Sequence, residues 1–346
     1  MLGVLNRVIG QTNTRLIALL LVLVAVFGVL VGDRLFGSLG LRSMASQLPE
    51  LGLLSLAMMV ALLSGGLDLS IIATANLSAL AVAAVLKSAP GAEGMMLLAV
   101  EVSALFAGFV TAAVIGTVNG LLIGYGRVSP ILATLGTMTL IKGLAIGLTH
   151  GSVISGFPPL VVFLGNGAVL GIPMPLILFG IVALVLAFIL TRTPFGVIAT
   201  LMGSNQQAVR FSGANTRAAL LGVYLLSAMV AATAGFVMMA RFDSANAAYG
   251  ESYLLVTILA CVLGGISPTG GFGRVSGLVI ALVILQLIST ACVLLGLSQF
   301  LTLALWGGIL LAIALSSVLR QRLWWLVGVG LRANRRRIDR DGPLSQ

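Results

Sequence analysis

Charged residues and metal-binding residues are scarce in this chain. Asp, Glu, Lys and Arg make up 8% of its 346 residues, whereas soluble domains carry about 25%. Charged residues at this frequency are too few to cover the surface of a water-soluble protein of this size. The mean hydropathy of +1.17 also indicates a protein that is not water-soluble. One histidine, His150, and two cysteines, Cys261 and Cys292, are too few for a zinc site or a disulfide framework. We therefore expect an integral membrane protein without a metal centre.

Lysine is scarce as well, and its positions exclude one kind of ATP site. Lys87 and Lys142 are the only lysines, and neither follows a glycine, as the lysine of a phosphate-binding P-loop does. We therefore expect no enzyme activity and no cofactor bound by this chain. The net charge of +10 does not indicate a nucleic-acid partner, because the basic residues lie at the chain ends and in short connectors rather than on one amphipathic face.

Long apolar runs are what the chain has in abundance. A membrane-spanning helix needs about 20 mostly apolar residues. Six windows qualify clearly: 16–32, 97–124, 176–190, 220–240, 277–297 and 300–319. Four more are shorter or less uniform: 51–64, 71–86, 131–148 and 253–264. Because unpaired backbone groups are not tolerated in hydrocarbon, we predict an all-α fold of about ten transmembrane helices, some short or broken, or eight if the short windows combine.

The placement of basic residues predicts the orientation in the membrane. With ten spans and the N-terminus inside, fourteen arginines fall on the inner side and four basic residues on the outer side. The positive-inside rule then places both termini in the cytoplasm. We expect residues 1–15 to be a cytoplasmic N-terminus and residues 16–319 a single transmembrane domain with a cytoplasmic loop at 191–217. An Arg-rich cytoplasmic tail at 320–346 is expected to contact anionic membrane lipid.

Four polar residues inside apolar windows are candidates for a solute path. A charge in the membrane is costly, so each needs an explanation. Asp68 follows Gly65 and Gly66 at a break between two short windows, where it either caps the next helix or contacts solute. Lys142 has three possible roles: it pairs with a carboxylate, extends its ammonium group to the membrane surface, or binds solute. For Asn119, and for Asn76 which resembles it, a hydrogen bond between helices is the favoured explanation and solute contact the other.

Two further segments of the sequence bear on function. Residues 263–274 form a second glycine-rich break, and one break in each half of the chain is typical of transporters. In the cytoplasmic loop, residues 205–211 lack Gly and Pro, which predicts a short helix with Ser204 or Asn205 as its N-cap and Gly213 at its end. Such a helix lies on the headgroups, closes a loop or binds a partner.

Six motifs in order resemble one family, the permease subunits of bacterial ABC importers of the ribose, xylose and autoinducer-2 class. They are Ser-Gly-Gly-Leu-Asp-Leu-Ser at 64–70, Gly-Thr-Val-Asn-Gly-Leu-Leu-Ile at 116–123, Pro-Ile-Leu-Ala-Thr-Leu-Gly-Thr-Met at 130–138 with Lys-Gly-Leu-Ala at 142–145, the segments 203–213 and 262–273, and Leu-Leu-Gly-Leu-Ser-Gln-Phe at 294–300. The resemblance runs from about residue 49 to 319. The sequence departs from the family pattern at two places, and the identity of the sugar therefore stays open. The first is Ile71-Ile72-Ala73, which lacks the family's glycine, and the second is Lys142, which replaces its arginine.

The resemblance implies a function and a set of partners. It implies a permease in the bacterial inner membrane that imports a sugar or a sugar-like polar solute by alternating access. Its partners would be a cytoplasmic ATPase dimer, a second permease copy or paralogue, and a periplasmic solute-binding protein. Residues 205–212 would be the coupling helix, and the ATPase-coupling residues would be Gly203, Asn205, Ala208, Ser212 and Gly213. The alternatives are a permease for branched-chain amino acids or nucleosides, and a stand-alone secondary transporter or channel.

Overall fold

The computed structural model describes residues 2–298, 300–312 and 315, and the chain divides into two compact units, Met1–Leu297 and Ser298–Gln346. The description below concerns the first unit. Of the second, the described part contains the short apolar helix Phe300–Ala312. The Arg-rich tail predicted at 320–346 lies outside the described residues, as does the end of the window at 300–319.

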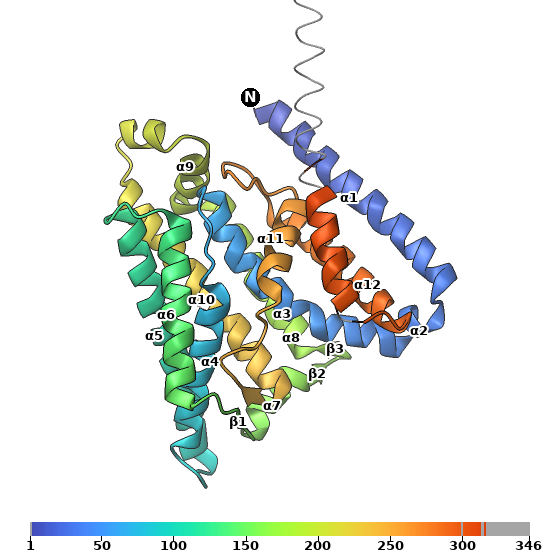
Figure 1. The fold of residues 1–346 in the computed structure, drawn as a ribbon, viewed down its shortest axis with the longest axis vertical. Coiled ribbons are helices and arrows are strands. Elements are labelled where there is room, and N and C mark those ends of the chain that lie inside the picture. The colour runs from blue at the N-terminus through green and yellow to red at the C-terminus, as the bar shows by residue number, and fades with distance from the viewer. Residues whose placement is uncertain (1, 299, 313–314, 316–346) are drawn as a thin grey trace, which may run out of the picture. The chain divides into compact units, whose positions relative to one another are not determined.

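Nearly all regular structure in the first unit is helical (Figure 1). The elements are α1 (Leu2–Leu30), α2 (Asp33–Phe36), α3 (Ser38–Leu63), α4 (Ile71–Lys87), α5 (Gly94–Gly124), α6 (Pro130–Thr149), β1 (Ile154–Ser155), α7 (Pro159–Asn166), β2 (Ala168–Val169), β3 (Ile172–Pro173), α8 (Met174–Arg192), α9 (Pro194–Phe211), α10 (Thr216–Phe242), β4 (Ser244–Ala245), α11 (Tyr253–Leu263) and α12 (Val275–Leu294).

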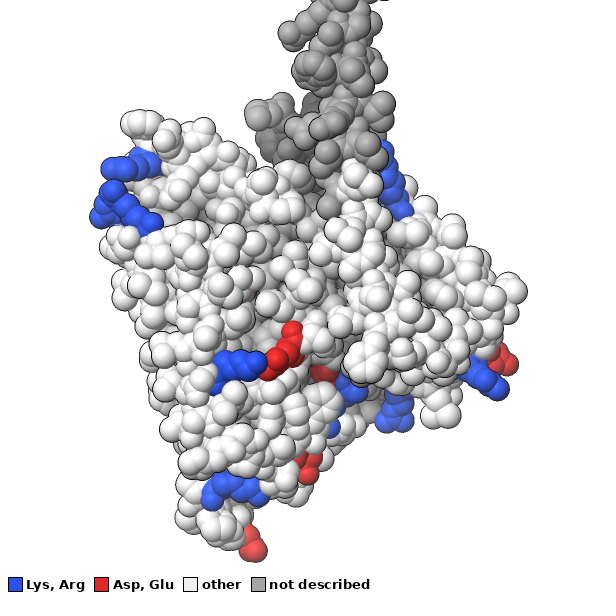
Figure 2. Space-filling view, viewed as in Figure 1, with Lys and Arg blue, Asp and Glu red and all other residues white. Residues whose placement is uncertain are grey.

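The helices coincide with the apolar windows of the sequence. Among the described residues, seven helices are long and apolar enough to cross a membrane: α1, α3, α5, α6, α8, α10 and α12. The shorter apolar helices are α4, α11 and Phe300–Ala312. The all-α membrane fold is thereby confirmed, and the count of ten spans stays a prediction. Charged residues are sparse on the surface that Figure 2 shows, as an environment of lipid requires.

The second span is longer than predicted. The short windows at 51–64 and 71–86 predict either two half-helices or one broken element. A half-helix at 51–64 is wrong, because α3 begins at Ser38 and contains Pro49. Pro49 and Glu50 interrupt the apolar run without ending the helix. Glu50 is 1% exposed and is paired with Arg241 of α10, so its charge is compensated inside the protein.

Helix α10 lies at the centre of the first unit, where it packs against α3, α4 and α5. Small residues allow this close approach. A β-carbon on Gly235 of α10 would collide with the backbone of Ala75 in α4. Such contacts between small residues hold helices together in lipid, where burial of apolar side chains gives no advantage.

The segment that follows α6 is ordered, although it is rich in Gly and Pro. Strand β1 pairs antiparallel with β4, with Ile154 opposite Ala245, and β2 forms a hairpin with β3. Helix α7 is tied to the end of α10, because Asn166 donates hydrogen bonds to the carbonyls of Ala240 and Arg241. These elements cover the end of the unit opposite to α9 (Figure 1).

Candidate functional site

The break between α3 and α4 is held by a buried polar network around Asp68. One carboxylate oxygen, Oδ1, accepts hydrogen bonds from the backbone N–H (3.1 Å) and the hydroxyl (2.6 Å) of Ser70. The other, Oδ2, accepts from the hydroxyl of Ser227 in α10 at 2.8 Å. Asp68 is 1% exposed, and three hydrogen bonds compensate much of the cost of burying it. Asp68 was expected either to cap α4 or to contact solute. The only backbone N–H that it accepts from among the described residues is that of Ser70, which is the N-cap residue of α4.

Asn119 joins the same network. Its amide nitrogen donates to the Ser70 hydroxyl at 2.9 Å, while its amide oxygen has no partner among the described residues. Two of the four predicted path residues, Asp68 and Asn119, therefore meet through Ser70, and both are buried. The roles of Ser70 and Ser227 were not predicted. Ser70 was noted only as the last residue of the motif at 64–70, and a serine such as Ser227 within an apolar helix carries no positional signal.

The other two predicted path residues line one cavity. It has a volume of about 160 Å³. Its lining consists of Ile72, Ala73, Asn76, Met138, Lys142, Ala247, Glu251 and Leu254. Lys142 Nζ lies 2.7 Å from Glu251 Oε1, and both side chains are nearly half exposed. Asn76 donates to the carbonyls of Ala247 (3.0 Å) and Tyr249 (2.9 Å). Helices α4 and α6, the segment before α11 and the first turn of α11 thus build this site.

The short helix predicted in the loop at 191–217 is present. Helix α9 is kinked at Asn205, whose φ of −161° and ψ of 94° are extended, and residues 206–211 form the helix beyond the kink. Asn205 is its N-cap, because its side-chain oxygen accepts a hydrogen bond from the Ala208 N–H at 2.9 Å. Gly213, with φ of +85°, ends it. We call residues 203–213 the coupling segment. The helical residues 194–204 before it were not predicted.

The coupling segment is fixed by Val209 and leaves other residues exposed. Val209 is buried against Met202 and Ala219. Gln206, Gln207 and Arg210 are exposed, and Phe211 is 91% exposed. An aromatic side chain held this far out on an ordered helix is a contact available to another molecule.

Three glycine-containing segments meet where the coupling segment begins. A β-carbon on Gly203 would collide with the carbonyl oxygen of Leu63 and with the amide nitrogen of Gly271. The Gly271 N–H in turn donates to the Leu63 carbonyl at 3.1 Å. A β-carbon on Gly270 would lie 2.6 Å from the nitrogen of Gly65. The coupling segment therefore touches both predicted breaks, 64–70 and 263–274, through backbone atoms. We call this contact the glycine junction.

Comparison with known proteins gives a family match over most of the chain. Residues 40–314 match the family described as "Branched-chain amino acid transport system / permease component". No solved structure is significantly similar to the chain.

Among curated proteins, sugar import permeases are similar to this chain. The ribose import permease protein RbsC of Bacillus subtilis is 35% identical over 276 residues, which cover 79% of this chain and 83% of that protein. The RbsC protein of Escherichia coli K12 is 33% identical over 288 residues, with coverage of 81% and 86%. The galactose/methyl galactoside import permease protein MglC of Salmonella typhimurium is 32% identical over 215 residues, with coverage of 60% and 64%.

Proposed function

Because the chain belongs to the family of permease components of branched-chain amino acid transport systems, we propose that it is the membrane-spanning permease subunit of an ATP-driven importer. Its solute is a sugar or a sugar-like polar compound, a proposal supported by the names of the ribose and galactose relatives. The observation that carries the proposal is the glycine junction, in which an exposed coupling segment contacts both helix breaks.

The energy for transport comes from a separate cytoplasmic ATPase dimer. The coupling segment presents Gln206, Gln207 and Phe211 to it. When the ATPases close, the coupling segment moves, and the backbone contacts of Gly203 pass this movement to the two breaks. Such a device drives transport only if the ATPases bind the two permease states with different affinities. The chain itself binds no nucleotide in this proposal.

Asn76 and Lys142 contact solute on its path, and Asp68 and Asn119 hold the break that shapes the path. This division rests on the cavity and not on burial, since Asn76 is buried as Asp68 and Asn119 are. The first pair lines the cavity, whereas the second pair lies outside its lining and meets through Ser70. A periplasmic binding protein delivers the solute to the end that β1, β4 and α7 cover.

A second permease copy packs against α6. Gly136, Gly143 and Gly147 of this helix have no neighbour within 4 Å of the position a β-carbon would take. Gly143 and Gly147 form a Gly-x-x-x-Gly pair, which lets two membrane helices approach closely. The pair lies next to Lys142 in the sequence, so the cavity borders the proposed dimer interface. A paralogue with a similar helix would fit equally well.

The orientation follows from charge. Arg127, Arg210 and Arg217 line one cavity at the end of the unit that carries α9. The positive-inside rule supports placing this end in the cytoplasm of a bacterium, with the protein in the inner membrane and both termini inside.

Reconstitution into liposomes tests the function. The permease is reconstituted alone and together with its cognate ATPase and binding protein, and uptake of labelled ribose, galactose and leucine is measured with and without ATP. We expect uptake of a sugar only in the complete system with ATP. Leucine as the sole transported solute supports the amino acid alternative. Solute flux through the permease alone at the rate of the complete system refutes the proposal and favours a stand-alone transporter.

A further inference from the structure

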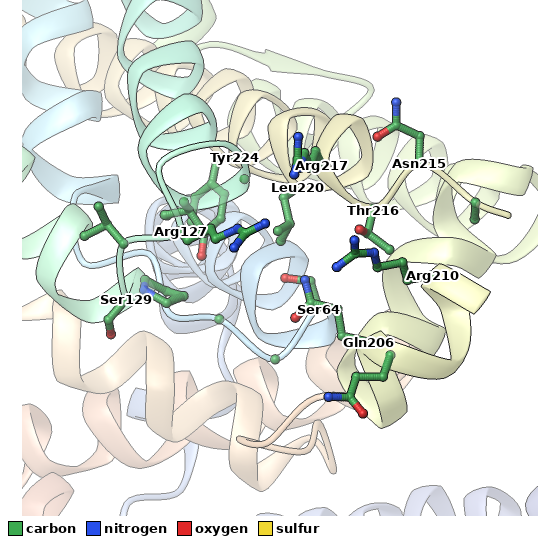
Figure 3. Close-up of a pocket in the computed structure, with 18 residues that line it drawn as sticks. Ser64, Arg127, Ser129, Gln206, Arg210, Asn215, Thr216, Arg217, Leu220 and Tyr224 are labelled. Atoms are coloured by element: carbon green, nitrogen blue, oxygen red, sulfur yellow. The ribbon is translucent and has the colours of Figure 1, made fainter. Parts of the chain in front are cut away.

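A large cavity lies beside the coupling segment and is lined by arginines (Figure 3). Its volume is about 740 Å³. The break after α3, the α5–α6 turn, the coupling segment and the first turns of α10 line it. Arg127, Arg210 and Arg217 are among its lining residues, and no Asp or Glu is. The cavity therefore has a positive electrostatic potential that nothing in its lining offsets.

Two of these arginines face the same space. Arg127 lies in the α5–α6 turn and Arg210 in the coupling segment, and Figure 3 shows their guanidinium groups reaching toward each other across the cavity. Neither side chain has a hydrogen bond or an ion pair with another described residue. Arg217 differs, because it points away from the other two in Figure 3 and lies 6.0 Å from the ring centroid of Tyr125.

A buried hydroxyl without a partner points to a ligand in the same place. Tyr224 of α10 is fully buried, and its hydroxyl has no hydrogen-bond partner among the described residues. Tyr224 lines the cavity, beside Arg127 in Figure 3. A buried hydroxyl that makes no hydrogen bond destabilises a protein, so such groups normally have a partner.

The helices add to the attraction for an anion. The N-cap residues of α6 and α10, Ser129 and Asn215, both lie in the lining, so two helix N-termini border the cavity. A helix N-terminus carries a partial positive charge and favours anions. The cavity thus combines two unpaired guanidinium groups, an unpaired hydroxyl donor and two helix N-termini around one space.

We propose that this cavity is a binding site for a phosphate group. Arg127 and Arg210 bind its oxygens by charge-assisted hydrogen bonds, and the Tyr224 hydroxyl donates to it. A phosphate dianion balances two arginines, whereas a single carboxylate balances one. The volume leaves room for the remainder of a phosphorylated molecule, so the group belongs to a soluble phosphate compound or to a lipid headgroup. The site binds without ATPase or solute, so its test is independent of the proposed transport function.

Thermal unfolding of the full chain in lipid nanodiscs tests the site. In phosphatidylcholine nanodiscs, inorganic phosphate is titrated at constant ionic strength. We expect a saturable rise in the midpoint of unfolding. In R127Q and R210Q the apparent Kd should rise about tenfold or more, because each loses a charge-assisted hydrogen bond. In Y224F it should rise about threefold, because one neutral donor is lost. R192Q, an arginine outside the lining, is the matched control.

A second set of nanodiscs distinguishes the two sources of the phosphate group. These contain phosphatidic acid, whose headgroup is a phosphate monoester that carries up to two negative charges, whereas the diester of phosphatidylcholine carries one. If the occupant is a lipid headgroup, phosphatidic acid stabilises the wild type but not R127Q, and it competes with inorganic phosphate. If the occupant is soluble, phosphate binding is the same in both lipids. Absence of stabilisation by either probe overturns the proposal, as does binding that R127Q, R210Q and Y224F all leave unchanged.

Discussion

Gly203 of the coupling segment and Gly271 of the second helix break lie backbone against backbone, with no space between them for a side chain. This contact joins helix α9 to a loop that is far from it in the sequence. Because both partners are backbone, a shift of one segment displaces the other directly, without the freedom that side-chain rotamers would introduce. Rigid contacts of this kind are suited to passing a small displacement into the membrane domain.

Replacing Gly203 with alanine is expected to uncouple transport. The added methyl group would collide with backbone atoms on Leu63 and Gly271, and overpacking of this kind typically costs about 1–3 kcal/mol. The junction must open to accommodate it. We expect ATP-driven uptake in the reconstituted complex to fall by about fivefold or more, since 1 kcal/mol corresponds to about fivefold. The protein should still insert in the membrane.

Gly180 in α8 provides the matched control. Nothing lies within 4 Å of the position that its β-carbon would occupy. G180A adds the same methyl group to a helix and should leave uptake unchanged, because alanine is the better helix former. Wild-type uptake by G203A would show that the junction does not transmit the movement.

The helices were largely predictable from the sequence, because the bilayer imposes one requirement, a long apolar run, that the sequence shows directly. The prediction failed at α3, where Pro49 and Glu50 interrupt the run. The partner that makes Glu50 acceptable in the interior is Arg241, which is 191 positions away in the chain. A pairing at that distance cannot be read from local composition, so the first half of α3 was missed.

Replacing Asn205 with alanine tests the cap of the short helix. The extended backbone of Asn205 suits any residue, so N205A removes the hydrogen bond to the Ala208 N–H and little else. Loss of an N-cap costs about 1 kcal/mol. In a helix of two turns this lowers the folded fraction markedly, and we expect the permease to stimulate its ATPase about fivefold less. Steady-state ATP hydrolysis by the complex measures this.

Serine retains a capping oxygen, so N205S should restore most of the stimulation. Equal losses in N205A and N205S would contradict a capping role. They would indicate that the Asn205 side chain contacts the ATPase itself.

Replacing Asp68 with asparagine tests whether this residue is structural. Asparagine has one acceptor oxygen where the carboxylate has two, so D68N cannot accept from both Ser70 and Ser227 in the same way. We expect D68N to lower the free energy of unfolding by about 1–3 kcal/mol, the cost of leaving buried polar groups unsatisfied. Denaturation of the purified protein in detergent measures the change.

S227A removes one donor to the same carboxylate and completes a double-mutant cycle. Because the two side chains are bonded, the double variant should lose less stability than the two single losses added together. Additive losses would mean that the Asp68–Ser227 hydrogen bond contributes nothing. Unchanged stability in D68N together with lost uptake would favour direct contact with solute.

The pairing of Lys142 shows what the sequence left open. A carboxylate partner was expected as one alternative, but Glu251 was not identified, because it lies in the segment before α11 and outside every apolar window. Only the fold brings α6 to that segment. Asn76 and Lys142 were selected independently as polar residues in membrane helices, and they line one cavity because α4 packs against α6.

Exchanging the charges of Lys142 and Glu251 separates pairing from solute binding. Both side chains are nearly half exposed, and such pairs contribute about 1 kcal/mol or less to stability. K142E and E251K each place two like charges together, so each is expected to reduce stability slightly and uptake strongly.

If the ion pair only connects α6 to the segment before α11, the double variant K142E/E251K restores both stability and uptake. If Lys142 contacts the solute, the double variant restores stability while uptake stays low, because the position facing the solute then carries the opposite charge. We expect the second result, since the pair lies in a cavity lined by Asn76 and not at a closed helix contact. Uptake and thermal unfolding measured on the same reconstituted samples decide between them.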